Sequence, residues 1–132
     1  MRAGNMFGRP QESRLTDIHR FDQNHRRSRA VAYGGLVFLA GQVANDADGD
    51  IRQQSREALA KVDGMLAQAG TDKSRVLSAT IWLREMDDYE GFNEVWDEWV
   101  VPGVTPARSC GKVALADSRQ RVEIIVIAAT RQ

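Results

Sequence analysis

Two charged residues in the last quarter of the sequence have the types and spacing for chemistry on a small organic acid. Arg108 lies in the stretch of residues 105–110, and Glu123 interrupts the otherwise apolar run of residues 122–129. A guanidinium group can bind a carboxylate through two parallel hydrogen bonds. A carboxylate can orient a water molecule or transfer protons. The pair therefore predicts a site that binds an organic acid and acts on it by acid–base chemistry.

A structural role for the same two residues is the alternative. A charge within an apolar strand is costly unless it is paired, and Arg108 is the nearest candidate partner of Glu123. We expect the two residues to lie on neighbouring antiparallel strands. An ion pair that only neutralises Glu123 would then explain both residues, and the sequence pattern by itself leaves the two interpretations open.

Cys110 follows Arg108 by two residues and is the only cysteine of the chain. A nucleophilic cysteine needs a partner base and a lowered pKa, but His19 and His25 lie far away in a polar segment. We therefore interpret Cys110 as a small, half-buried residue. A single cysteine excludes an intrachain disulfide and a CxxC site, which fits a reducing compartment.

Composition and charge narrow the class of protein. The 132 residues suffice for one domain, and 18 basic residues balance 18 acidic ones. Nucleic-acid binders usually show a basic excess, whereas the only basic cluster here is Arg26, Arg27 and Arg29. No apolar run approaches the roughly 18 residues of a membrane helix, and residues 1–6 contain no signal-peptide pattern. We expect a cytoplasmic protein that binds neither nucleic acid nor membrane.

The hydrophobic pattern predicts a polar N-terminal arm over residues 1–24 and one domain over residues 25–132. Within the domain, a hairpin is predicted for residues 30–33 and 36–40, with Gly34 and Gly35 in its turn. Helices are predicted for residues 51–69 and 89–100, and further strands for residues 76–84, 107–115 and 121–130. Along the strand of residues 76–84, Val76 should share a face with Ser78. The expected class is α+β, with a mixed sheet of five or six strands.

This set of elements implies self-association. Two helices can cover only one face of a sheet, yet the strand of residues 121–130 is apolar on both faces, as is typical of a strand buried on both sides. Another copy of the chain is the simplest cover for the second face. We therefore expect a homo-oligomer with sites at the borders between subunits.

Several motifs together resemble the RidA (YjgF-type) enamine/imine deaminase family, over about residue 27 to the C-terminus. The matching segments are Pro106-Ala107-Arg108-Ser109-Cys110, Val122-Glu123-Ile124, Ala40-Gly41-Gln42 and Asp88-Tyr89-x-x-Phe92-Asn93. Two further segments look closer to a YoaB-like branch: Arg26-x-Ser28 and Trp96-x-x-Trp99-Val100-Val101.

The resemblance implies a chorismate-mutase-like fold, a homotrimer with clefts between subunits, and hydrolysis of 2-imino acids to 2-keto acids and ammonia without metal or cofactor. Arg108 would bind the substrate carboxylate and Glu123 would position the attacking water. Gly41 and the backbone of Cys110 would line the pocket, and Asn93 would support it.

Two positions depart from the family pattern. Arg27 stands where the family usually has Tyr, and Ala40 where it has Ser before Gly-Gln. We expect Arg27 to line the substrate pocket. The lost hydroxyl and the added cation would change the substrate range or leave a binding site with weak catalysis. A non-catalytic trimer that binds small carboxylates, or acts as a regulatory or chaperone-like partner, is the alternative function. Ribonuclease activity has been proposed for relatives, but the balanced charge argues against it.

Overall fold

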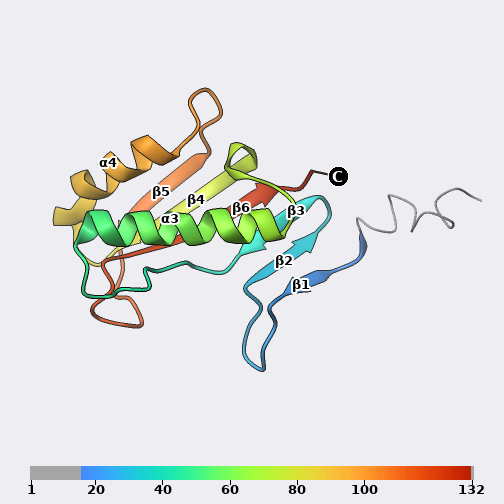
Figure 1. Cartoon of the computed structure of the whole chain (residues 1–132), viewed down its shortest axis with the longest axis horizontal. Helices are drawn as coiled ribbons and strands as arrows, with labels where there is room; N and C mark the ends of the chain where they lie inside the picture. The colour runs from blue at the N-terminus through green and yellow to red at the C-terminus, as the bar shows by residue number, and fades with distance from the viewer. Residues whose placement is uncertain (1–15, 132) are drawn as a thin grey trace, which may run out of the picture.

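The computed structural model describes residues 16–131, which form one six-stranded sheet and two α-helices (Figure 1). In chain order the strands and helices are β1 (His19–Phe21), β2 (Ala30–Tyr33), β3 (Leu36–Leu39), α3 (Ile51–Gln68), β4 (Val76–Leu83), α4 (Tyr89–Trp99), β5 (Ala107–Lys112) and β6 (Val122–Ala129). Short 3₁₀ turns precede β4 and α4, at Lys73–Arg75 and Met86–Asp88. The predicted α+β class is confirmed.

The strand order is β1-β2-β3-β6-β4-β5, and every neighbouring pair is antiparallel except β4 and β5. β6 is central because its side chains are apolar on both faces. The prediction that the strands of Arg108 and Glu123 are neighbours is wrong, since β4 lies between β5 and β6. β5 is instead the edge strand of the sheet.

The hairpin of β2 and β3 forms as predicted. Gly34 and Gly35 have φ angles of 63° and 82°, the left-handed values that a tight two-residue hairpin turn requires. The sheet also contains a strand, β1, that lies closer to the N-terminus than the first predicted strand. β1 pairs with β2 although its residues fall in the segment assigned to the polar arm. Residues 1–15 of that arm lie outside the described residues.

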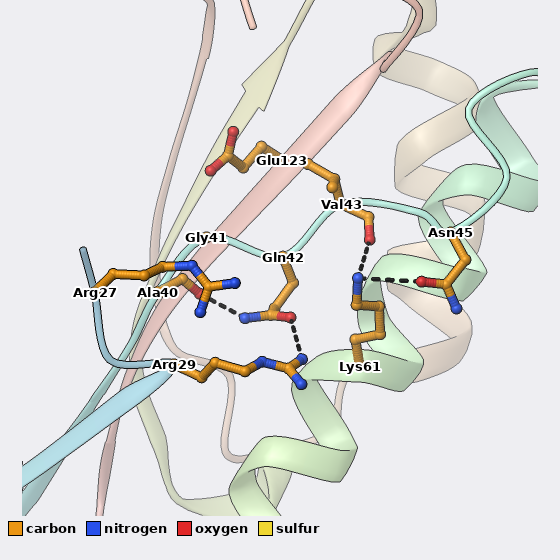
Figure 2. A pocket seen from close by; sticks show the side chains of 9 residues that line it. All are labelled: Arg27, Arg29, Ala40, Gly41, Gln42, Val43, Asn45, Lys61 and Glu123. Carbon is orange, nitrogen blue, oxygen red and sulfur yellow. Dashed lines mark hydrogen bonds between the residues drawn. The ribbon is translucent and has the colours of Figure 1, made fainter. Parts of the chain in front are cut away.

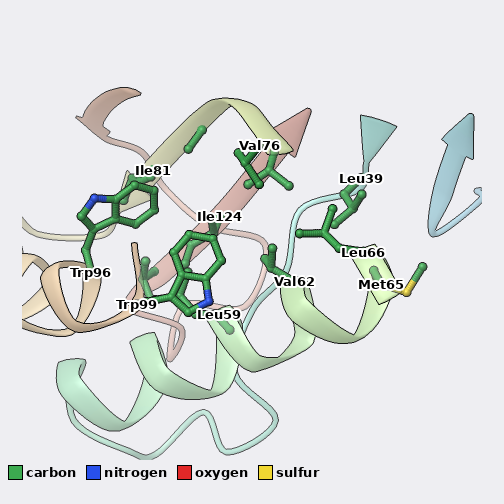
Figure 3. Packing of buried hydrophobic residues seen from close by; sticks show 14 of the residues in the cluster. Leu39, Leu59, Val62, Met65, Leu66, Val76, Ile81, Trp96, Trp99 and Ile124 are labelled. Atoms are coloured by element: carbon green, nitrogen blue, oxygen red, sulfur yellow. The ribbon is translucent and has the colours of Figure 1, made fainter. Parts of the chain in front are cut away.

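Both helices pack on the same face of the sheet (Figure 1). α3 starts at an N-cap, Asp50, whose carboxylate accepts a hydrogen bond from Gln53 N, and Gly70 follows its end with φ 80°. Figure 3 shows Leu59, Val62 and Leu66 of α3 and Trp96 and Trp99 of α4 packed against strand residues that include Ile81 of β4 and Ile124 of β6.

One polar side chain is buried beneath α3 and joins it to β6. Gln54 is fully buried. Its Nε2 donates to the carbonyl oxygens of Ala47 and Gly49, and its Oε1 accepts from Arg121 N at 2.8 Å. These bonds fix the loop before α3 against Arg121, the residue that precedes β6, and therefore the position of Glu123 two residues later.

The opposite face of the sheet carries apolar side chains that no helix covers. Tyr33 and Phe38 are 48% and 42% exposed, and Ile125 and Ile127 are half-buried. At the start of β4 the predicted face assignment of Val76 is wrong. A register shift between Val76 and Ser78 inserts Leu77 as an extra residue, so Val76 turns into the core.

Within residues 16–131, neither helix combines the length and the apolar character that a membrane span requires.

Candidate functional site

The residues predicted to form the site fall into two groups on opposite faces of the sheet. Arg108 is paired with Ala79 of β4, and Glu123 is paired with Trp82 of the same strand. Because successive strand residues alternate between faces, positions 79 and 82 point in opposite directions. Ala79 faces the helices and is buried. Arg108 therefore faces the helices and Glu123 faces the uncovered side.

Glu123 lies beside an irregularity that Gly41 makes possible. β3 pairs Phe38 with Ile127, and the next bridge joins Gln42 to Ile124, so residues 39–41 oppose only residues 125–126. Such a bulge redirects the chain and brings Gly41 against the Glu123 side chain. A Cβ atom at Gly41 would overlap Glu123 Oε2 and lie 2.7 Å from its Cδ. Only glycine leaves the carboxylate where it is.

The Glu123 carboxylate is half-buried and unpaired. Burial raises its pKa above the usual value of 4.5, and no other cause contributes to the shift. Among the described residues, neither a hydrogen bond nor an ion pair engages this carboxylate. A carboxylate with a raised pKa in a cleft is a candidate general base.

Gly41 and Glu123 border a pocket of about 710 Å³ that also contains three basic side chains (Figure 2). We call it the Glu123 pocket; it is lined by Arg27, Arg29, Ala40, Gly41, Gln42, Val43, Asn45, Lys61 and Glu123. The buried Gln42 side chain organises its floor: Nε2 donates to Ala40 O at 2.8 Å, and Oε1 accepts from Arg29 Nη2 at 3.4 Å.

Arg108 is held in place by aromatic rings instead of a carboxylate. Its guanidinium carbon lies 5.9 Å from the ring centre of Tyr89, 5.7 Å from that of Phe92 and 5.3 Å from that of Trp96. These distances are typical of cation–π contacts, and Arg108 Nη2 also donates to Tyr89 Oη at 3.4 Å. No ion pair within the described part of the chain involves Arg108, so its donors other than the one bonded to Tyr89 remain available to a ligand.

Asn93 and Cys110 accompany Arg108. Asn93 lies four residues after Tyr89 and three before Trp96, so it shares the side of α4 that carries these two rings. Asn93 Oδ1 is buried and has no hydrogen-bond partner among the described residues. Burial raises the pKa of the Cys110 thiol, although the Arg108 charge partly opposes the rise. A thiol with a raised pKa is a poor nucleophile.

A single chain thus brings Arg27, Gly41 and Glu123 together, and Asn93, Arg108 and Cys110 together, but it keeps the two groups apart. The alternative interpretation, an internal ion pair between Arg108 and Glu123, is wrong for the single chain. Sequence reasoning missed the other two basic residues of the Glu123 pocket, Arg29 and Lys61. The cluster of arginines at positions 26, 27 and 29 was a visible signal for Arg29, whereas Lys61 was one of several polar residues on a helix.

Comparisons with known proteins agree on the family. The model of the family described as Endoribonuclease L-PSP matches residues 17–130. A RutC family protein of Haemophilus ducreyi is 42% identical over 112 residues, covering 85% of this chain and 96% of that protein. The RutC family protein YoaB of Escherichia coli is 35% identical over 112 residues, covering 85% and 97%.

Solved structures share the fold. The crystal structure of a YjgF family member from Neisseria meningitidis superposes with a TM-score of 0.86 at 43% identity, covering 89% of this chain and 98% of that one.

Proposed function

Because the chain belongs to the Endoribonuclease L-PSP family, and its resemblance to YjgF-type proteins is thereby confirmed, we propose that it is an imine deaminase. The reaction is hydrolysis of reactive 2-imino acids, and of the enamines that tautomerise to them, to 2-keto acids and ammonia. The RutC and YjgF names of the relatives state the family and no substrate, so the activity is our inference from the site.

The observation that carries the proposal is the availability of both key charges. Arg108 is fixed by three aromatic rings and has no carboxylate partner in the described chain. Glu123 is half-buried beside Gly41, and it too is unpaired. Charges that served only the fold would be expected to satisfy each other. Two preoriented and unpaired charges of opposite sign are what a carboxylate-bearing substrate and its attacking water require.

The two groups would meet between copies of the chain. The face of the sheet that carries Glu123 also carries the uncovered Phe38, Ile125 and Ile127, and the Arg108 strand is an edge with unpaired backbone groups. A cyclic trimer joins two different surfaces of neighbouring subunits at each interface. Each of its three clefts would contain Glu123 of one subunit and Arg108 of the next.

The chemistry needs few groups because imines already hydrolyse in water. Arg108 would bind the substrate carboxylate through two hydrogen bonds, and Asn93 and the Cys110 backbone would complete that end of the cleft. Glu123 would take a proton from water as the oxygen adds to C2 of the imine. It would pass that proton to the imine nitrogen, which gives a carbinolamine. It would then carry the hydroxyl proton of the carbinolamine to the amino nitrogen as the C=O bond forms, the C–N bond breaks and ammonia leaves. Positioning and acid–base help of this kind are worth about 10²–10⁴-fold.

The test is release of ammonia from 2-iminopropionate and 2-iminobutyrate generated in situ. Wild type should exceed the uncatalysed rate, and Arg108→Ala should return to it. If wild type does no better than the enzyme-free control, the deaminase proposal fails. Binding of 2-keto acids in that event would favour the second candidate, a non-catalytic carboxylate-binding trimer, for which the absence of a hydroxyl at Ala40 is the supporting observation. A monomeric mass in light scattering would contradict the shared cleft.

A further inference from the structure

Three basic side chains converge on the wall of the Glu123 pocket, and the proposed deamination of small imino acids uses at most one of them. They are Arg27 and Arg29, which lie in the segment between β1 and β2, and Lys61 of α3. Arg29 directly precedes β2. Figure 2 shows the two guanidinium groups and the ammonium group gathered around the Gln42 side chain, while the Glu123 carboxylate lies across the Gly41–Gln42 backbone from that side chain.

These like charges are close enough to disturb one another. Burial lowers the pKa of Lys61, and the charges of Arg29 and Arg27 lower it further. Holding like charges together costs free energy unless an anion compensates them. The cluster therefore either destabilises the fold without serving a function or is the preformed site of an anion.

Neighbouring groups of the described chain do not supply that anion. Lys61 Nζ donates to Val43 O at 3.0 Å and to Asn45 Oδ1 at 3.3 Å, which are neutral groups. Glu57 acts on Lys61 through its charge, but its carboxylate accepts hydrogen bonds from Asp46 N and Gln53 Nε2. None of the ion pairs found within residues 16–131 includes Arg27, Arg29 or Lys61.

We propose that Arg27, Arg29 and Lys61 bind a second negatively charged group of the substrate, so that the preferred substrates are dicarboxylic 2-imino acids. This inference rests on the proposed function and names its substrate class. Arg108 of the neighbouring subunit binds the carboxylate next to the imine, and Glu123 stands between that end and the basic cluster. The pocket volume of about 710 Å³ lies within the roughly 300–1,000 Å³ of pockets that enclose drug-sized ligands. It therefore has room for a chain longer than that of 2-iminobutyrate.

The experiment compares kcat/KM for 2-iminoglutarate and 2-iminobutyrate in wild type, Arg27→Gln and Arg29→Gln. Wild type should prefer the dicarboxylic imine by about tenfold or more, and each variant should reduce that preference severalfold, since charge-assisted hydrogen bonds are lost. Arg27→Gln should fold like wild type, because no hydrogen bond of the Arg27 side chain is found in the described structure. Arg56→Gln is the matched control. It removes an exposed cation of α3 outside the Glu123 pocket and should leave the preference unchanged.

A binding measurement separates this inference from the proposed function. Calorimetry with 2-oxoglutarate and 2-oxobutyrate needs no turnover. One outcome is that wild type deaminates neither imine but binds 2-oxoglutarate more tightly than 2-oxobutyrate, and that both arginine variants lose this difference in affinity. The dianion site then stands and the deaminase proposal falls.

If both imines are deaminated equally well and neither arginine variant changes the ratio, the deaminase proposal stands and the dianion site is overturned. A single-stranded oligoribonucleotide that binds through Arg27 and Arg29, with no binding of 2-oxoglutarate, would also overturn the inference.

Discussion

Arg108 and Glu123 lie on opposite faces of the same sheet, and β4 separates the strands that carry them. A catalytic pair with this arrangement cannot act within one chain. It can act where the Glu123 face of one subunit meets the Arg108 edge of another. The proposed activity therefore requires that subunits assemble in this way, and activity and assembly can be tested in the same experiment.

Inactive subunits that lack different members of the pair should complement each other. The Arg108→Ala and Glu123→Gln variants are each expected to be inactive. Unfolding and refolding them as a one-to-one mixture should restore activity in about one quarter of the clefts, because a cleft needs Glu123 from one variant and Arg108 from its neighbour. The measurement is ammonia release per subunit, compared with wild type refolded in the same way.

The same two variants, mixed without refolding, are the control for this experiment. Mixing the two variants without refolding should give no activity if subunits do not exchange. If the refolded mixture contains mixed trimers and remains inactive, the assignment of the two residues to different subunits is wrong.

Gly41→Ala should abolish activity while leaving the fold intact. The added Cβ would overlap Glu123 Oε2, so the carboxylate must move by about an ångström or more, and a shift of that size costs on the order of 10²-fold in rate. The displaced atoms belong to a flexible side chain, so the free energy of unfolding should change by less than about 1 kcal/mol. Steady-state kinetics and urea unfolding of the same preparation check both statements.

Gly64→Ala is the matched control for the glycine substitution. Gly64 lies within α3, and a Cβ atom there meets no heavy atom within 4 Å. Since glycine within a helix costs about 1 kcal/mol relative to alanine, this variant should be more stable by up to that amount and fully active. A loss of activity in Gly64→Ala would show that the Gly41 result has a less local cause.

The sequence pattern was sufficient for features set by local periodicity. It predicted the Gly34–Gly35 hairpin, the helix α3 and the doubly apolar β6, because each depends on residues within a few positions of one another. It failed at the neighbour relationship of Arg108 and Glu123. Strand order depends on how β6 pairs between β3 and β4, and no local pattern encodes that pairing.

Local sequence patterns also could not predict the basic cluster or the face on which Val76 lies, because neither is encoded by nearby residues. Arg29 and Lys61 are more than 30 residues apart in sequence and come close only in the fold, where Lys61 of α3 bonds to Val43 O in the segment after β3. Val76 changes face because Leu77 forms a bulge, and a single inserted residue leaves the alternation of the strand unchanged on either side. Long-range pairing and bulges must be seen in the fold itself.

Gln54→Leu should destabilise the protein by about 3 kcal/mol, because it leaves the carbonyls of Ala47 and Gly49 and the N–H of Arg121 without their buried partner. Urea unfolding at a fixed protein concentration measures the difference. Gln68→Leu, at an exposed position of the same helix, is the control and should change stability by less than about 0.5 kcal/mol. Equal effects of the two substitutions would contradict the proposed role of Gln54.

Asp72 should contribute a distinct part of the acid sensitivity of the fold. Its carboxylate accepts hydrogen bonds from Ser74 N at 2.9 Å and from Arg131 Nε at 3.1 Å. The Ser74 hydroxyl, followed by the Arg131 side chain, lowers the pKa of Asp72 from 3.8 to about 2. A depressed pKa means that the folded state favours the ionised form. The stabilisation is therefore complete above pH 3.8 and is lost as the pH falls towards about 2.

Asp72→Asn should accordingly be less stable than wild type near neutral pH, and the difference should vanish across that acidic window. Unfolding midpoints measured from neutral pH down to about pH 2 give the comparison. Asp87→Asn, which removes an exposed carboxylate that makes neither of these bonds, corrects for the general loss of negative charge. A stability difference that persists undiminished at the acidic end would assign the effect of Asp72 to packing, because only an ionised carboxylate loses its advantage on protonation.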